Sequence, residues 1–210
     1  MQESAWVPEY GLKDIEVQSS TLVYDGHYQV YKIALRHKCF KRGWGPVVLR
    51  EKLDRHDAAS AMLYDPVRDQ VVLVEQLRIG LIDRQDKPNP WMLEIVAGLI
   101  DQPGESPEAT IIRESVEEAG CEIKELIPIT SFYNSPGGFT ELTYLYCGII
   151  QLTETDLENQ PEEDEDLKIH ILKWQDAKAL WESSWVTSAS TYIALQWLEK
   201  NRQQLMSKYG

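Results

Sequence analysis

Hydrophobic and polar positions alternate along the first fifty residues in a pattern typical of β-strands. Two alternating runs cover 15–24 and 27–36, and Asp25-Gly26 between them is a strong hairpin signal. A third run covers 47–53. The pattern predicts a small antiparallel β-domain over residues 1–50, followed by a second domain over 51–210.

Beyond residue 58 the apolar runs become more continuous, as in buried strands. Strands are expected at 71–80, 91–100, 126–133, 141–151 and 167–174. Helices are expected at 106–120, 175–182 and 188–206. Strands around one strong helix, with further helices at the end, predict an α/β domain of packed layers.

The charge balance narrows the range of partners. The 210 residues include 21 Lys or Arg and 34 Asp or Glu, which gives a formal net charge of −13. A strongly acidic chain repels phosphate backbones and anionic membranes, so neither nucleic acid nor membrane is expected as a partner. A phosphorylated ligand would need local arginines or bound cations.

Cysteine usage and the N-terminal sequence bear on the compartment. Cys39, Cys121 and Cys147 form no CxxC pair, so they indicate neither a disulfide framework nor a thiolate zinc site. The N-terminus lacks the basic and apolar regions of a secretory signal, and no run of 18 apolar residues suggests a membrane span. We therefore expect a cytoplasmic protein.

The clearest helix signal lies at 106–120. Ser106 is a good N-cap, and Pro107 follows at the first helical position, where its missing N–H has no cost. Gly120 supplies a left-handed stop after the last turn. These signals predict a helix that is capped at Ser106 and stops at Gly120.

A helical wheel at about 100° per residue separates this helix into two faces. Glu114, Glu117 and Glu118 share one face, and Arg113 can pair with Glu117 four residues on. The far side is apolar: Ala109, Ile112, Val116 and Ala119. The pattern predicts that the apolar side docks on a core. The carboxylates are then either a solvated acidic face or hard oxygen ligands for Mg²⁺ or Mn²⁺.

The spacing of these residues relative to others before and after the helix favours the second interpretation, in which the glutamates are metal ligands. The segment G98-LIDQPG-E105-SPEATII-R113-E114-SV-E117-E118-A-G120-C121 resembles the Nudix box, Gx5Ex7REUxEExGU, in which U is a bulky apolar residue. Six residues, rather than five, separate Gly98 from Glu105, and Ser115 and Cys121 stand where bulky apolar residues are usual. Because the extra residue precedes the helix, the register of the carboxylates is preserved.

The Nudix family hydrolyses nucleoside diphosphates linked to another moiety. The resemblance implies a Nudix α/β/α sandwich with a mixed sheet, preceded by the small antiparallel β-domain. The segments at 65–80, 91–98 and 135–141 further resemble the bacterial ADP-ribose pyrophosphatase subgroup, as does YDGHYQV near the N-terminus, which is similar to its swapped dimerisation domain. This implies Mg²⁺-dependent (alternatively Mn²⁺-dependent) hydrolysis of ADP-ribose to AMP and ribose 5-phosphate by a homodimer with shared active sites.

The same resemblance implies roles for the metal-site residues. The carbonyl of Ala97 and the carboxylates of Glu114 and Glu118 would bind metal, with Glu117 as a further ligand or a partner of one. In the acidic segment 154–166, Glu163 matches the general base and Glu165 a carboxylate that contacts metal, while Glu162 and Glu165 are the alternatives for the base.

It also implies substrate contacts. His27 and Tyr28 match positions that stack adenine, Arg78 matches a phosphate ligand, and Glu141 matches a residue that accepts ribose hydroxyls or acts as another base. Residues matching contacts from the dimer partner are Arg50, Glu51 and Arg55. Residues matching the sugar side are Leu99, Ser135, Pro136 and Gly137.

Two alternative functions stay open. One is the same chemistry on another nucleoside diphosphate sugar such as GDP-mannose, and the other is a non-catalytic sensor of ADP-ribose. The intact set of three glutamates favours catalysis. The sequence holds no HExxH, P-loop or GxSxG motif, which argues against a zinc protease, a P-loop NTPase and a serine hydrolase.

Overall fold

The computed structural model describes residues 6–85, 89–153, 166–183 and 185–210. The chain divides into two compact units. Unit 1 comprises Met1–Arg55 together with Ser135–Glu141, and unit 2 comprises His56–Asn134 and Leu142–Gly210.

Unit 1 is built on an antiparallel sheet, which confirms the expected N-terminal β-structure. Its elements are η1 (Leu12–Asp14), β1 (Ile15–Asp25), β2 (Gln29–Cys39), β3 (Gly43–Trp44) and β4 (Val48–Asp54). Strand β2 pairs with all three other strands, and the β1–β2 hairpin closes at the Asp25–Gln29 pair. No residue of β1–β4 is fully buried, so this sheet has no core of its own in the single chain.

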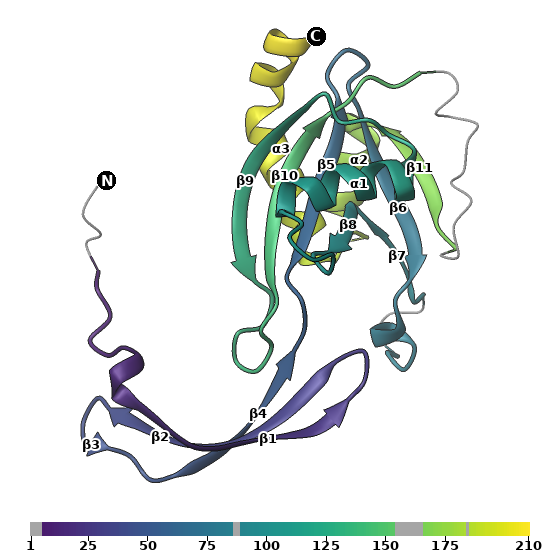
Figure 1. Ribbon diagram of the computed structural model, residues 1–210. Coiled ribbons are helices and arrows are strands. Elements are labelled where there is room, and N and C mark those ends of the chain that lie inside the picture. The colour runs from purple at the N-terminus through teal and green to yellow at the C-terminus, as the bar shows by residue number, and fades with distance from the viewer. Residues whose placement is uncertain (1–5, 86–88, 154–165, 184) are drawn as a thin grey trace. The chain divides into compact units, whose positions relative to one another are not determined.

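Unit 2 contains a mixed sheet covered by helices on both faces (Figure 1). The strands are β5 (Ala58–Asp65), β6 (Gln70–Leu77), β7 (Trp91–Glu94), β8 (Val96–Leu99), β9 (Glu125–Tyr133), β10 (Leu142–Ile149) and β11 (Lys168–Lys173). The helices are η2 (Ile79–Leu81), α1 (Pro107–Ala119), α2 (Trp174–Glu182) and α3 (Ala189–Tyr209). The strand order is β11-β6-β5-β10-β9, with β5 and β10 parallel and the other pairs antiparallel.

Two apolar clusters hold the layers together. Side chains alternate along β5, so Met62 and Tyr64 face one cluster while Ala61 and Leu63 face the other. The first cluster includes residues of α2 and α3, and the second includes Ile111 of α1. The α/β/α sandwich expected from the sequence is thus confirmed. Among the described residues, no helix has the length and apolar character needed to cross a membrane.

The strand expected at 91–100 is divided into two. Strands β5 and β6 pair only between Leu63–Asp65 and Gln70–Val72, and beyond this they separate. Strand β7 then pairs with β6, and β8 pairs with β5. At the break, the backbone N–H of Ile95 donates to Thr191 Oγ1 of α3, 3.0 Å away. The division lets β8 lie beside β5 and under α1.

An ion pair fastens α3 to the turn between β5 and β6. Arg202 donates from Nε and Nη2 to the two carboxylate oxygens of Asp69, at 2.6 and 2.7 Å, and Tyr64 donates to the same carboxylate. Bidentate pairing of this kind is the strongest geometry available to arginine. The contact therefore couples the last helix to the central strand.

Replacing Arg202 with Gln is expected to lower the free energy of unfolding by about 2 kcal/mol, because the variant leaves the Asp69 carboxylate without its cation. Both side chains are partly exposed, and solvent screening keeps the loss below that of a fully buried pair. The melting temperature should fall by roughly 4–8 °C. Lys178→Gln, which removes an exposed ion pair with Glu199, is the matched control and should shift it far less.

The stabilisation that the Arg202–Asp69 pair provides should depend on pH. Hydrogen bonds from Arg202 hold the pKa of Asp69 below its ordinary value of 3.8. A carboxylate whose pKa is depressed in the fold stabilises it above the unfolded pKa, and the contribution is lost as pH falls through the folded pKa. The stability gap between wild type and Arg202→Gln should be full at neutral pH and shrink below about pH 4. A constant gap in acid would contradict this assignment.

Candidate active site

Helix α1 begins and ends as its sequence predicts. The Ser106 side chain accepts a hydrogen bond from the backbone N–H of Ala109, and Pro107 is the first helical residue. Gly120 is in the left-handed conformation with φ 64°, and its N–H bonds back to the last turn. Tyr146 of β10 donates to Glu108 at 2.9 Å, which fixes the first turn against the sheet. These contacts set the position of every carboxylate on the helix.

The face that α1 buries differs from the expectation. Ile112 and Val116 are 46% and 48% exposed, so the prediction that the side containing them docks on the core is wrong. The residues buried on α1 are Thr110, Ile111, Ser115, Glu118 and Ala119. Ile111, about 20° from Glu118 on the wheel, provides the apolar anchor.

Satisfied hydrogen bonds explain how a polar face can be buried. The Ser115 hydroxyl lies 2.9 Å from the carbonyls of both Ile112 and Cys121, and its single proton is shared between these two acceptors. Thr110 bonds to Glu105 and to the carbonyl of Ser106. Ser115, which departs from the usual bulky residue of the Nudix box, therefore stabilises the end of the helix. The helix thereby brings Glu118 into the protein interior and leaves the Glu114 side chain only 15% exposed.

Glu118 and Glu114 lie against neighbouring residues of β8. Glu118 is 5% exposed, and its Oε2 accepts the backbone N–H of Ala97 at 3.1 Å. The Glu114 side chain lies over Gly98, so closely that a Cβ atom on Gly98 would overlap its carboxylate. The structure thus brings Ala97, Glu114 and Glu118 together.

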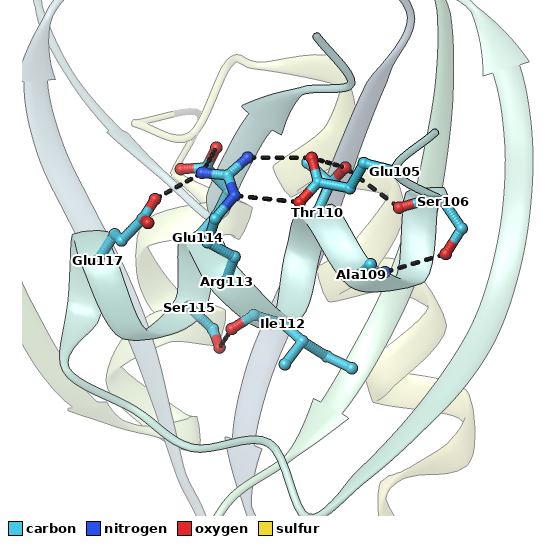
Figure 2. A network of polar contacts seen from close by, with 9 residues as sticks. All are labelled: Glu105, Ser106, Ala109, Thr110, Ile112, Arg113, Glu114, Ser115 and Glu117. Atoms are coloured by element: carbon cyan, nitrogen blue, oxygen red, sulfur yellow. Dashed lines mark hydrogen bonds and ion pairs between the residues drawn. The ribbon is translucent and has the colours of Figure 1, made fainter. Parts of the chain in front are cut away.

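Arg113 links three carboxylates around this pair of glutamates, as Figure 2 shows. Its Nη1 lies 2.8 Å from Glu114 Oε1 and 2.5 Å from Glu117 Oε2, which confirms the expected pairing with Glu117. Its Nε lies 3.1 Å from Glu105 Oε1. The guanidinium lowers the pKa of Glu105, and hydrogen bonding to Glu105 in turn raises the pKa of Arg113. Glu105 keeps a defined place despite the extra residue before it.

The carboxylates suit a hard divalent cation chemically. Among the described residues, no group of three or more His, Cys, Asp or Glu side chains is arranged to hold a metal ion. Glu114 and Glu118 nevertheless converge on one strand and are largely withdrawn from solvent, where an added positive charge would stabilise them. Oxygen donors are those that Mg²⁺ and Mn²⁺ prefer. The residues therefore fit the metal that the sequence predicts.

Arg78 lies at the end of β6 and pairs with a residue that sequence reasoning missed. Its Nε donates to Glu94 Oε2 at 2.5 Å, and its backbone N–H donates to the carbonyl of Pro90. Glu94 is buried, and Arg78 remains 42% exposed. A buried carboxylate within a run of apolar residues, as in WMLEIVAG, was the available signal.

Unit 1 contains a second group of predicted site residues, those expected to contact the substrate. Arg55 Nη1 lies 3.4 Å from Glu141 Oε2 and 3.4 Å from the Tyr28 hydroxyl, and its guanidinium is 5.4 Å from the Tyr28 ring centre. Phe139, which the sequence did not single out, contacts the Tyr28 ring edge-on. The buried Arg55 Nε makes no hydrogen bond in the described part of the protein. Tyr28, Arg55 and Glu141 thus form one cluster.

The remaining predicted residues have less structural support. His27 contacts Tyr28 edge-on, at 4.8 Å between ring centres. Arg50 and Glu51 are exposed on β4, and Leu99 ends β8. Ser135 accepts hydrogen bonds that close the turn containing Pro136 and Gly137. Glu163, Glu165 and the alternative base Glu162 lie outside the described residues.

Comparisons with known proteins agree with this geometry. A family model described as "NUDIX domain" matches residues 54–195. The chain is 35% identical over 205 residues to the ADP-ribose pyrophosphatase of Haemophilus influenzae, covering 97% of this chain and 94% of the relative. It is 35% identical over 202 residues to that of Escherichia coli (strain K12), covering 96% and 95%.

Two further matches have lower sequence identity. The GDP-mannose pyrophosphatase of Yersinia pestis (strain Pestoides F) is 32% identical over 151 residues, which cover 72% of this chain and 75% of the relative. A crystal structure titled "ADP compounds hydrolase" superimposes with a TM-score of 0.68 at 19% identity, covering 91% of this chain and 98% of that one, and it supports the fold. The family model, the long matches and the inward-facing carboxylates together show that the chain belongs to the Nudix hydrolase family.

Proposed function

We propose that the protein hydrolyses the diphosphate bond of ADP-ribose, giving AMP and ribose 5-phosphate, and that it requires Mg²⁺, for which Mn²⁺ can substitute. The observation that carries the proposal is the placement of Glu114 and Glu118 against β8, in a chain similar over nearly its whole length to ADP-ribose pyrophosphatases. A solvated acidic face would have left Glu118 exposed.

The metal-binding residues in this proposal are the Ala97 carbonyl, Glu114 and Glu118, with Glu117 as a further ligand or partner. When bound, divalent ions neutralise the diphosphate and make a water nucleophilic. Glu118 is oriented by the Ala97 N–H, and Arg113 orients Glu114 and Glu117. Glu165 and the base Glu163 are assigned by resemblance only.

The substrate-binding residues are assigned in the same way. Tyr28 offers an aromatic face and Arg55 a donor without a partner in the described chain, which suit a nucleotide base and its oxygen acceptors. Glu141 suits ribose hydroxyls, and Arg78 suits a phosphate. The other proposed contacts are His27, Arg50, Glu51, Leu99, Ser135, Pro136 and Gly137.

A homodimer with shared sites belongs to the proposal. Strand β1 is exposed throughout, including the apolar side chains of Val17, Leu22 and Val23. A small sheet without a covered apolar face is at best marginally stable, so a second copy is the expected cover. We accordingly propose that residues 1–50 form the dimerisation domain and 51–210 the hydrolase domain. The three free thiols suit a reducing cytoplasm.

The test is a comparison of two substrates. Purified protein with Mg²⁺ is incubated with ADP-ribose and, separately, with GDP-mannose, the substrate suggested by the Yersinia relative. We expect AMP and ribose 5-phosphate from ADP-ribose, abolished by EDTA and restored by Mg²⁺, with a higher kcat/KM than for GDP-mannose. No AMP at micromolar enzyme would overturn the proposal, and a reversed ratio of kcat/KM would favour the alternative substrate.

A further inference from the structure

Glu94 is a buried carboxylate on the sheet face that carries the candidate metal ligands. It lies opposite Val74 in the ladder between β6 and β7, and directly opposed side chains share a face. Val74 packs in the same apolar cluster as Ile111 of α1. Glu94 therefore projects from the face that α1 covers, where Glu114 lies over Gly98.

The partner of Glu94 is a half-exposed arginine. Glu94 is 8% exposed and binds Nε of Arg78 at 2.5 Å. In the portion of the chain that the structure describes, Arg78 uses no other side-chain nitrogen for a hydrogen bond. The guanidinium is thus held through Nε, which leaves its Nη1 and Nη2 donors without a hydrogen bond to any described residue.

We propose that Glu94 is a positioning residue: it fixes Arg78 through Nε so that the Nη1 and Nη2 donors receive a phosphate oxygen of the substrate. The inference rests on the proposed hydrolysis of a nucleoside diphosphate sugar. An arginine binds phosphate best as a planar fork, and a fork fixed before binding loses less conformational freedom when the ligand arrives. The hydrogen bond from the Arg78 N–H to Pro90 fixes the backbone at the same place.

This arrangement predicts an effect on binding rather than on the chemical step. With Glu94→Gln, the guanidinium keeps its charge but loses the carboxylate that orients it. We expect KM for ADP-ribose to rise about tenfold, with kcat within about threefold of wild type. Arg78→Gln should raise KM at least as much. Because Glu94 acts through Arg78, the double variant should resemble Arg78→Gln instead of showing the product of both effects.

A control separates positioning from stability. Asp69→Asn weakens another arginine–carboxylate pair of unit 2, whose side chains are also only partly exposed, and it should lower the melting temperature while leaving KM unchanged. If Glu94→Gln fails to fold, Glu94→Asp, which retains the charge but shortens the side chain, is measured instead and should also raise KM.

The possible outcomes are distinct. Wild-type protein inactive on ADP-ribose would overturn the proposed function and this inference with it. Active wild type, with a raised KM in Arg78→Gln but a normal KM in the folded Glu94 variant, would overturn the positioning role alone. Independent, multiplicative effects of the two substitutions would also overturn it.

Discussion

Replacing Glu118 with Gln is expected to lower kcat for ADP-ribose by roughly three orders of magnitude, comparable to the loss of a key charge-stabilising group in other enzymes. The amide is neutral and cannot balance the charge of a divalent ion. Its oxygen can still accept the Ala97 N–H, which Glu118 binds at 3.1 Å, so the buried hydrogen bond survives. AMP release under saturating Mg²⁺ measures kcat, and thermal melting should show an intact fold.

The matched control for Glu118→Gln is Glu122→Gln. Glu122 lies three residues after the end of α1, with a mostly exposed side chain paired to Lys124. The substitution makes the same change in net charge, but kcat should not change. Mn²⁺ binding, followed by electron paramagnetic resonance without substrate, should weaken in Glu118→Gln and not in the control. Unchanged Mn²⁺ affinity and turnover in Glu118→Gln would exclude Glu118 as a metal ligand.

Local signals in the sequence predicted the elements well. The caps at Ser106 and Gly120 depend on a few neighbouring residues, and both appear as expected. The hairpin signalled by Asp25-Gly26 also forms, but its loop covers 26–28 and its second strand begins at Gln29 instead of residue 27. Helical spacing likewise predicted the Arg113–Glu117 pair, since residues four apart on a helix are neighbours. Contacts between residues close in sequence are those that a pattern can specify.

Contacts between distant residues were less predictable. A helical wheel weighs side chains by polarity, so it could not show that Ser115 and Glu118 would find partners in Cys121 and Ala97. The break at Ile95 depends on Thr191, which lies 96 residues further along the chain. The cluster of Tyr28, Arg55 and Glu141 unites three separate segments. In each case a hydrogen bond or ion pair from elsewhere outweighs the local preference.

The close approach of Glu114 to β8 predicts that replacing Gly98 with alanine will also have a large effect on kcat. A Cβ atom on Gly98 would overlap the Glu114 carboxylate, so Gly98→Ala must drive that side chain to another rotamer. The backbone at Gly98 is not in the left-handed region, and alanine is tolerated there. We therefore expect a loss of two to three orders of magnitude in kcat with little loss of stability.

Gly11→Ala is the control for Gly98→Ala, because a Cβ on Gly11 meets no atom within 4 Å and its backbone is extended. Turnover and melting temperature should both stay near wild type. In Gly98→Ala, Mn²⁺ binding should weaken together with turnover, since a displaced Glu114 no longer points at the site shared with Glu118. Normal turnover in a folded Gly98→Ala protein would mean that the position of Glu114 over β8 does not matter to the reaction. The metal site would then have to be sought among other carboxylates.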